Sequence, residues 1–166
     1  MLKTAIDQGL EAIDTASGYG DSEAIIGRCL DQELKSRVSI VTKLDPLSAL
    51  TSQSEISVCE SFVDSSVNTS LAKLDIDRID TLLLHRVTHL TQCNSAIFNR
   101  LLFHKKEGRI GSLGVSVQNP EELIQSIANQ EIEHIQMPFN ICDWREIDMA
   151  TFARQDNGRS GLIKHD

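Results

Sequence analysis

The sequence contains no cluster of basic residues, no long apolar run and no Cys-x-x-Cys pair, and each of these absences argues against a class of function. A protein that binds nucleic acid needs grouped lysines and arginines to neutralise phosphates, whereas this 166-residue chain has a formal net charge of −8. A membrane-spanning helix needs about 20 largely apolar residues in succession. We therefore expect neither a nucleic acid nor a membrane as a partner.

Cysteine usage gives little support for disulfide bonds. The four cysteines are Cys29, Cys59, Cys93 and Cys142, and they lie far apart in the chain. Residues 1–4 show no apolar segment of the kind that begins a signal peptide. Cys29 and Cys59 fall within apolar helical patterns and are expected to be buried as small hydrophobic side chains. We therefore expect a cytoplasmic protein with free thiols.

The composition is that of a globular protein, with 40% hydrophobic and 24% charged residues, and we expect one domain over residues 1–166. Strand-like and helix-like segments alternate along it. The expected helices are residues 2–9, 22–35, 52–74, 95–107 and 120–129, and the expected strands are residues 11–13, 38–42, 79–84, 110–117 and 132–137. Residues 82–84, three consecutive leucines, are typical of a parallel strand buried on both faces.

Repeated strand–helix–strand units form either an open doubly wound sheet or a closed (β/α)8 barrel, and periodicity alone leaves both open. Both architectures place functional groups at the carboxyl ends of the strands. The side chains found there are Asp14 with Tyr19 in the following loop, Lys43, His85, Ser116 and Gln136.

Four of these side chains form a chemically coherent set. A phenol is a weak proton donor, but a nearby ammonium such as Lys43 favours the phenolate of Tyr19 and makes it a better acid. Asp14 would keep the lysine charged, and a neutral His85 would orient a carbonyl oxygen. Each residue alone also has an ordinary structural explanation, such as a turn cap, a loop packing residue, a surface lysine or a buried histidine. Their shared placement at the strand ends favours a site that protonates a carbonyl while a cofactor delivers hydride.

The motifs around these residues resemble those of the aldo-keto reductases. Residues 14–20 (DTASGYG), residues 41–44 (VTKL) and residues 82–86 (LLLHR) are similar to the motifs that follow the second, third and fourth barrel strands of that family. The resemblance covers about residues 1–144, whereas residues 145–166 form a tail that matches poorly. It implies an α/β fold, an incomplete (β/α)8 TIM barrel in which about five of eight strands are visible.

The resemblance also implies a function and a set of site residues. It assigns Asp14, Tyr19, Lys43 and His85 as the catalytic residues, with Tyr19 as proton donor to a small carbonyl substrate and NADP (NADPH) as cofactor. Ser116 and Gln136 are implied as contacts of the nicotinamide carboxamide. The family often has asparagine after this serine, where the present chain has Val117.

Two alternative functions remain open beside this interpretation, and one further property is expected. The chain could be a non-catalytic aldo-keto reductase-like fragment that acts as a binding module. A metal-dependent barrel hydrolase is a further alternative, because His85 and His89 are four residues apart, although no third ligand is well spaced. Unclosed barrel edges predict self-association.

Overall fold

The computed structural model describes residues 1–51, 53–138 and 163–165. Within them the elements follow the order α1 (Leu2–Asp7), β1 (Ala12–Asp14), α2 (Ser22–Cys29), α3 (Gln32–Lys35), β2 (Ser39–Lys43), α4 (Ile56–Leu74), β3 (Ile79–Leu84), the 3-10 helix η1 (Val87–Leu90), α5 (Ala96–Lys106), β4 (Ile110–Ser116), α6 (Pro120–Ile127), β5 (His134–Met137) and β6 (Ile163–His165).

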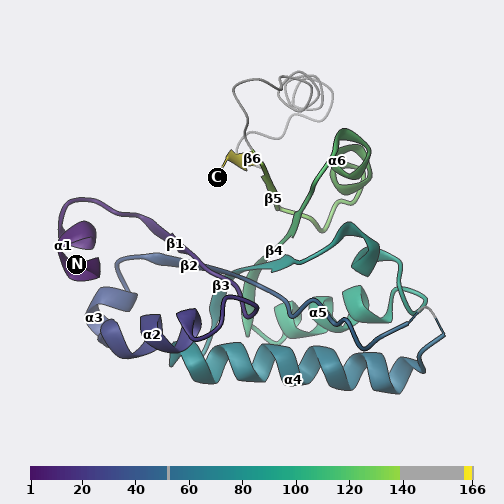
Figure 1. Cartoon of the computed structure of the whole chain (residues 1–166), viewed down its shortest axis with the longest axis horizontal. Helices are drawn as coiled ribbons and strands as arrows, with labels where there is room; N and C mark the ends of the chain where they lie inside the picture. Colours follow the sequence, from purple (N-terminus) through teal and green to yellow (C-terminus); the bar gives the residue numbers. More distant parts are fainter. Residues whose placement is uncertain (52, 139–162, 166) are drawn as a thin grey trace.

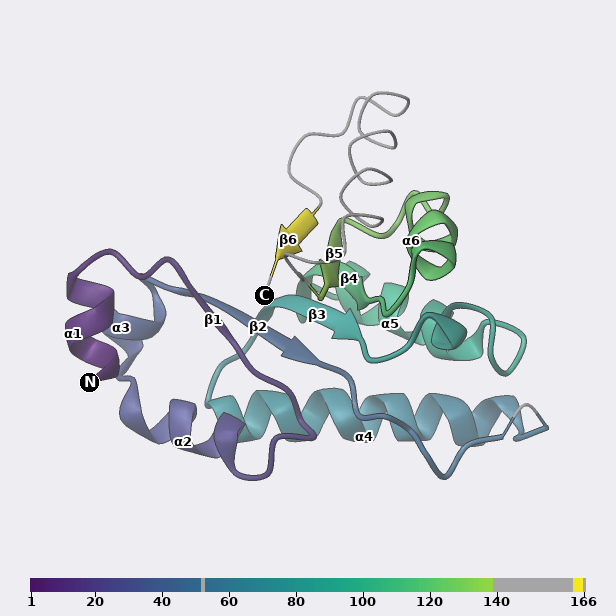
Figure 2. The ribbon, with the colours of Figure 1, turned by 45° about the horizontal axis from the view of Figure 1, so that its top comes forward.

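All six strands lie in one parallel sheet, in the same order as in the chain. A doubly wound sheet reverses its strand order at a switch point, so the sequential order excludes that alternative. Helices α2, α4 and α5 lie on one side of the sheet (Figures 1 and 2), with the long α4 running along it. The fold is therefore a partial (β/α)8 barrel, as the family resemblance implied.

The strand count differs from the prediction. The sequence indicated five strands, and the structure adds β6 (Ile163–His165), which pairs in parallel with β5. This segment is only three residues long, and no alternating or continuous apolar pattern marks it in the sequence. Its pairing partner, more than 20 residues earlier in the chain, defines it as a strand.

Two predicted helices differ from the structure by more than one or two residues at an end. The helix expected over residues 22–35 is two helices, because Leu30 is extended (φ −108°, ψ 123°) and Asp31 accepts a hydrogen bond from the Leu34 amide to begin α3. The helix expected from a capping box at Ser52 begins at Ile56, with Glu55 in the N-cap position; Ser52 lies outside the described residues. Local patterns place helices well but locate their ends poorly.

Hydrophobic packing forms two clusters. The larger lies between the sheet and helices α4 and α5, and the smaller joins α1, α2, α3 and the strands β1 and β2. Gly27 brings α2 against the end of α4, where a Cβ atom would clash with the backbone of Lys73 and Leu74. Ile25 of α2 and Ile56 of α4 are exposed and belong to neither cluster.

The cysteines correct an expectation of free thiols. Cys59, in the first turn of α4, and Cys93, in the loop before α5, form a disulfide across 34 residues. Cys29 is free but exposed rather than buried. Cys142 lies outside the described residues. Disulfide pairing depends on which helices become neighbours in the fold, and the spacing of cysteines in the sequence does not reveal it.

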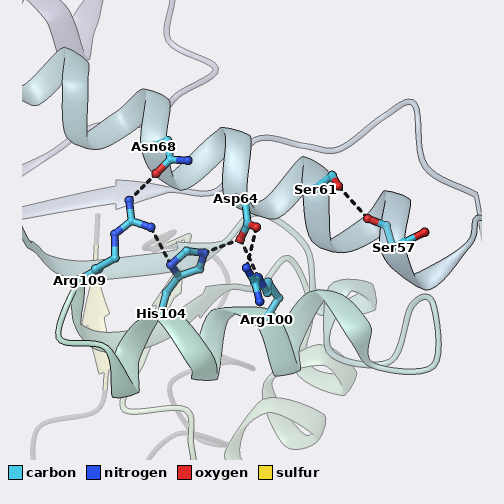
Figure 3. A network of polar contacts seen from close by, with 7 residues as sticks. All are labelled: Ser57, Ser61, Asp64, Asn68, Arg100, His104 and Arg109. Carbon is cyan, nitrogen blue, oxygen red and sulfur yellow. Dashed lines mark hydrogen bonds and ion pairs between the residues drawn. The ribbon is translucent and has the colours of Figure 1, made fainter.

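A polar network joins α4 to α5 on the outside of the sheet (Figure 3). Asp64 accepts two hydrogen bonds of 2.7 Å from Arg100 and lies 2.8 Å from Nε2 of the buried His104. Arg109, which can only donate, approaches Nδ1 of His104 at 3.1 Å, so Nε2 must carry the proton that His104 donates to Asp64. The contact with Arg100 lowers the pKa of Asp64 despite its partial burial.

Among the described residues, no helix is long and apolar enough to cross a membrane.

Candidate active site

The centre of the candidate site is an ion pair between neighbouring strands. Asp14 ends β1 and Lys43 ends β2, and the parallel pairing of these strands brings their ends together. The ammonium of Lys43 lies 2.9 Å and 3.2 Å from the two carboxylate oxygens of Asp14, and 3.4 Å from the carbonyl oxygen of Thr15. Lys43 is buried with 4% of its surface exposed, whereas Asp14 is open to solvent. These contacts hold the buried Lys43 side chain in a fixed direction.

Tyr19 lies over this ion pair. It is carried by the loop between β1 and α2, and the Lys43 ammonium is 5.3 Å from the centre of its ring. The ring is 56% exposed, so a bound molecule can reach it. Gly20 follows with φ +59°, a left-handed conformation that glycine adopts without strain and that turns the chain toward α2.

His85 follows β3 at the same edge of the sheet. Lys43 pairs in register with Leu83, and His85 lies two residues after Leu83, just beyond the end of β3. Burial lowers the pKa of His85, the charges of Arg86 and Lys43 lower it further, and Asp45 partly opposes them. A lowered pKa keeps the imidazole neutral near pH 7, the form that can orient a carbonyl oxygen by hydrogen bonding.

Ser116 and Gln136 lie side by side at the ends of β4 and β5. They are register partners in the parallel ladder, and Leu84 pairs with Val115, which puts Ser116 level with His85. Val117, the residue that replaces the family's frequent asparagine, is fully buried in the larger hydrophobic cluster. A valine in that position offers no polar contact to a bound molecule.

His89, the second histidine of the metal alternative, is buried. It lies in η1 with 2% of its surface exposed. Among the described residues, no group of three histidine, cysteine, aspartate or glutamate side chains is placed to hold a metal ion.

Sequence reasoning missed a polar cluster directly behind the ion pair. Glu23 of α2 is 1% exposed and accepts a 2.7 Å hydrogen bond from the hydroxyl of the buried Thr42. A second contact, between the hydroxyl groups of Thr15 and Ser22, measures 2.8 Å. No sequence signal marks Glu23 as buried, because an acidic residue in the first turn of a helix is common and is ordinarily exposed.

Comparison with known families decides the relationship. The model of the "Aldo/keto reductase family" matches residues 1–159. The chain belongs to this family. It is 28% identical over 166 residues to "Aldo-keto reductase YhdN" of Bacillus subtilis, covering 98% of this chain and 49% of the relative. It is 26% identical to "Methylglyoxal reductase YeaE" of Escherichia coli, covering 99% of this chain and 61% of the relative. The chain thus spans about half the length of these curated aldo-keto reductases.

Solved structures of the family have the same fold. A candidate aldo-keto reductase of Pseudomonas aeruginosa superimposes with a TM-score of 0.79 at 26% identity, covering 99% of this chain and 60% of its own. An aldo-keto reductase of Klebsiella pneumoniae, solved in complex with NADPH, gives a TM-score of 0.68 at 25% identity, covering 92% of this chain and 52% of its own. The predictions of family and of a partial barrel are confirmed by these matches.

Proposed function

We propose that the chain carries the catalytic half of an NADP-dependent oxidoreductase, which transfers a hydride between NADP(H) and an aldehyde or ketone, or the corresponding alcohol. The observation that carries the proposal is the arrangement of Asp14, Lys43 and Tyr19, in which a buried, ion-paired ammonium lies beneath an accessible phenol. Membership of the aldo-keto reductases supports the reaction class.

Tyr19 is the proposed general acid. Its phenol would donate a proton to the carbonyl oxygen as negative charge develops there, and the Lys43 ammonium would stabilise the phenolate that remains. The ion pair with Asp14 fixes the direction of the Lys43 side chain. His85, kept neutral by burial and neighbouring cations, would hydrogen-bond the same carbonyl oxygen and fix its orientation. In the oxidation direction the Tyr19 phenolate would accept the proton.

The chemistry of Ser116 and Gln136 fits the carboxamide of a nicotinamide ring. A hydroxyl and a primary amide at adjacent strand ends can together donate to a carboxamide oxygen and accept from its nitrogen. The cofactor, when bound, supplies the hydride that no side chain can provide. The choice of NADP is supported by the Klebsiella pneumoniae relative with bound NADPH.

NADPH binding and turnover test the proposal together. Binding would be followed by nicotinamide fluorescence, and oxidation of NADPH by an aldehyde such as nitrobenzaldehyde would be measured in the same sample. We expect Tyr19→Phe to bind NADPH as the wild-type chain does and to lose turnover by about 100-fold or more, because the proton donor is removed. Equal turnover in Tyr19→Phe and wild type would refute the role of Tyr19.

The same measurement separates the enzyme from the alternative of an inactive binding module. Binding of NADPH by the folded chain without any turnover would favour the binding module. Turnover that depends on Tyr19 would show that this part of the barrel holds a working site.

A further inference from the structure

The Tyr19 ring has little packing to hold it in place. It is 56% exposed, and the residues that flank it, Gly18 and Gly20, are also exposed. Its position over Lys43 must therefore be set by the backbone of the loop between β1 and α2 and by the contacts at the two ends of that loop. A catalytic group that is misplaced by about 1 Å can lose about 100-fold in rate.

The loop itself is internally hydrogen-bonded. The amide of Tyr19 donates to the carbonyl oxygen of Ala16 at 3.0 Å, and the amide of Ser22 donates to the carbonyl oxygen of Tyr19 at 3.1 Å. The amide of Ser17 donates to the carbonyl oxygen of Lys43 at 3.4 Å. These bonds make the loop a compact turn, whose place is then decided by where α2 begins.

Two side-chain contacts link the start of α2 to the strands. Successive side chains of a strand point to opposite faces, so Thr15 and Thr42 point away from the face on which their neighbours Asp14 and Lys43 meet. On that opposite side the Thr15 hydroxyl lies 2.8 Å from the Ser22 hydroxyl, and the Thr42 hydroxyl donates to Oε1 of Glu23 at 2.7 Å.

Glu23 is the unusual member of this group. It is 1% exposed, and its Oε2 has no hydrogen-bond partner among the described residues. Burying a carboxylate costs more than burying an apolar side chain of the same size, so stability alone does not account for a glutamate here. The group that it contacts, Thr42, directly precedes Lys43 in β2.

From this geometry we propose that the hydrogen bond between Thr42 and Glu23 is an anchor that fixes the first turn of α2 to the strand carrying Lys43, and thereby holds Tyr19 over the Lys43 ammonium. Glu23 and Thr42 are positioning residues, which act through Tyr19 without touching the substrate. The inference rests on the proposed role of Tyr19 in proton transfer.

The anchor can be tested without measuring activity, because Tyr19 is the only tyrosine of the chain. A chain labelled with carbon-13 in its tyrosine ring gives ring NMR signals from this residue alone. In Thr42→Val, which keeps the shape and removes the donor, we expect these signals to move toward those of the unfolded chain while the rest of the spectrum stays folded. Thr42→Ser restores the hydroxyl and should restore the Tyr19 signals. Glu33→Gln, an exposed glutamate of α3, is the matched control and should leave them unchanged.

A second variant covers the case in which Thr42→Val fails to fold because it leaves a buried carboxylate without its donor. Glu23→Met removes that charge and keeps a side chain of similar length, so we expect it to fold. It should move the Tyr19 signals in the same direction. Tyr19 signals at the wild-type position in folded Thr42→Val or in folded Glu23→Met would overturn the proposal.

Kinetics supply a second readout. We expect Thr42→Val and Glu23→Met to lower kcat by about tenfold or more while KM changes by less than about twofold, with recovery in Thr42→Ser. A wild-type chain without turnover would count against the proposed function, whereas the NMR comparison would still decide whether the anchor holds Tyr19.

Discussion

Among the described residues, two lysines are buried against aspartates, and only one of them lies at the candidate site. Lys43 contacts Asp14 at 2.9 Å, and Lys35 contacts Asp75 at 2.8 Å on another part of the molecule. We predict that Lys43→Met lowers turnover by about 100-fold or more, because the phenolate of Tyr19 loses the charge that stabilises it. Lys35→Met makes the same chemical change away from the site and should keep turnover within a few-fold. Steady-state kinetics of the two variants check the prediction, and equal losses in both would contradict it.

The free energy of unfolding is expected to depend on pH through the titration of His89. Burial lowers its pKa from an ordinary 6.5 to about 4, with smaller contributions from the charges of Arg86 and His85. The unfolded chain therefore takes up a proton on this side chain before the native state does. The contribution to stability is fully present above pH 6.5 and is lost progressively as the pH falls toward 4.

We expect the free energy of unfolding to fall by about 3 kcal/mol over this range from His89 alone. Urea denaturation at a series of pH values measures it. His89→Gln removes the titrating group and should flatten that part of the profile, although His85 and His104, whose pKa values are also lowered, keep some slope. An unchanged profile in His89→Gln would contradict the assignment.

The disulfide acts at the level of elements, since it links the start of α4 to the loop that precedes α5. The chain after Lys43 leads to the start of α4, and the chain after His85 leads to Cys93. The disulfide therefore limits how far the two loops beside the site can separate. Closing a loop of 34 residues removes conformational freedom from the unfolded chain, worth about 3–4 kcal/mol in the simple chain-entropy treatment.

We predict that reduction, or the double substitution Cys59→Ser with Cys93→Ser, lowers the melting temperature, whereas Cys29→Ser does not. Cys29 is exposed and free, so it is the matched control. Thiol counting before and after reduction must accompany the melting curves. Equal melting temperatures with and without reductant would show that the bond does not contribute to stability.

At the scale of the whole sheet, two of the described strands are hydrogen-bonded to a neighbouring strand on one side only. Within the described residues, β1 pairs with β2 and β6 pairs with β5, and both stand at the ends of the strand order. An open strand edge is a template for pairing with another chain. We propose self-association through these edges, as the sequence also suggested.

One substitution tests this at β1. Glu11 accepts a hydrogen bond from Ser39 and the Thr15 amide donates to Val41, so the alternation of a parallel strand turns the Ala12 amide toward the open edge. Ala12→Pro removes that donor and should shift sedimentation toward the monomer, with Ala12→Val as control. A wild-type chain that sediments as a monomer at all concentrations would contradict the prediction.

The sequence by itself determined the alternation of helices and strands from α1 to β5 and which polar residues stand at the strand ends. The capping of α6 is an example, since Asn119 and Pro120 specify its start locally and the structure shows the Asn119 side chain accepting from the Glu122 amide. Asp14 and Lys43 could be placed together because parallel strands end at a shared edge, a rule that needs no coordinates. The sequential strand order, which excludes the doubly wound alternative, was available before the structure only through the resemblance to the family.

The tertiary structure decided what depends on distant neighbours. Cys59 and Cys93 meet because α4 and the loop before α5 pack together, and β6 is a strand because β5 lies beside it. Glu23 is buried because α2 approaches β2, which no helical pattern reveals. Local sequence fixes backbone conformation through short-range sterics and capping, whereas burial and pairing across many residues are set only when the elements pack.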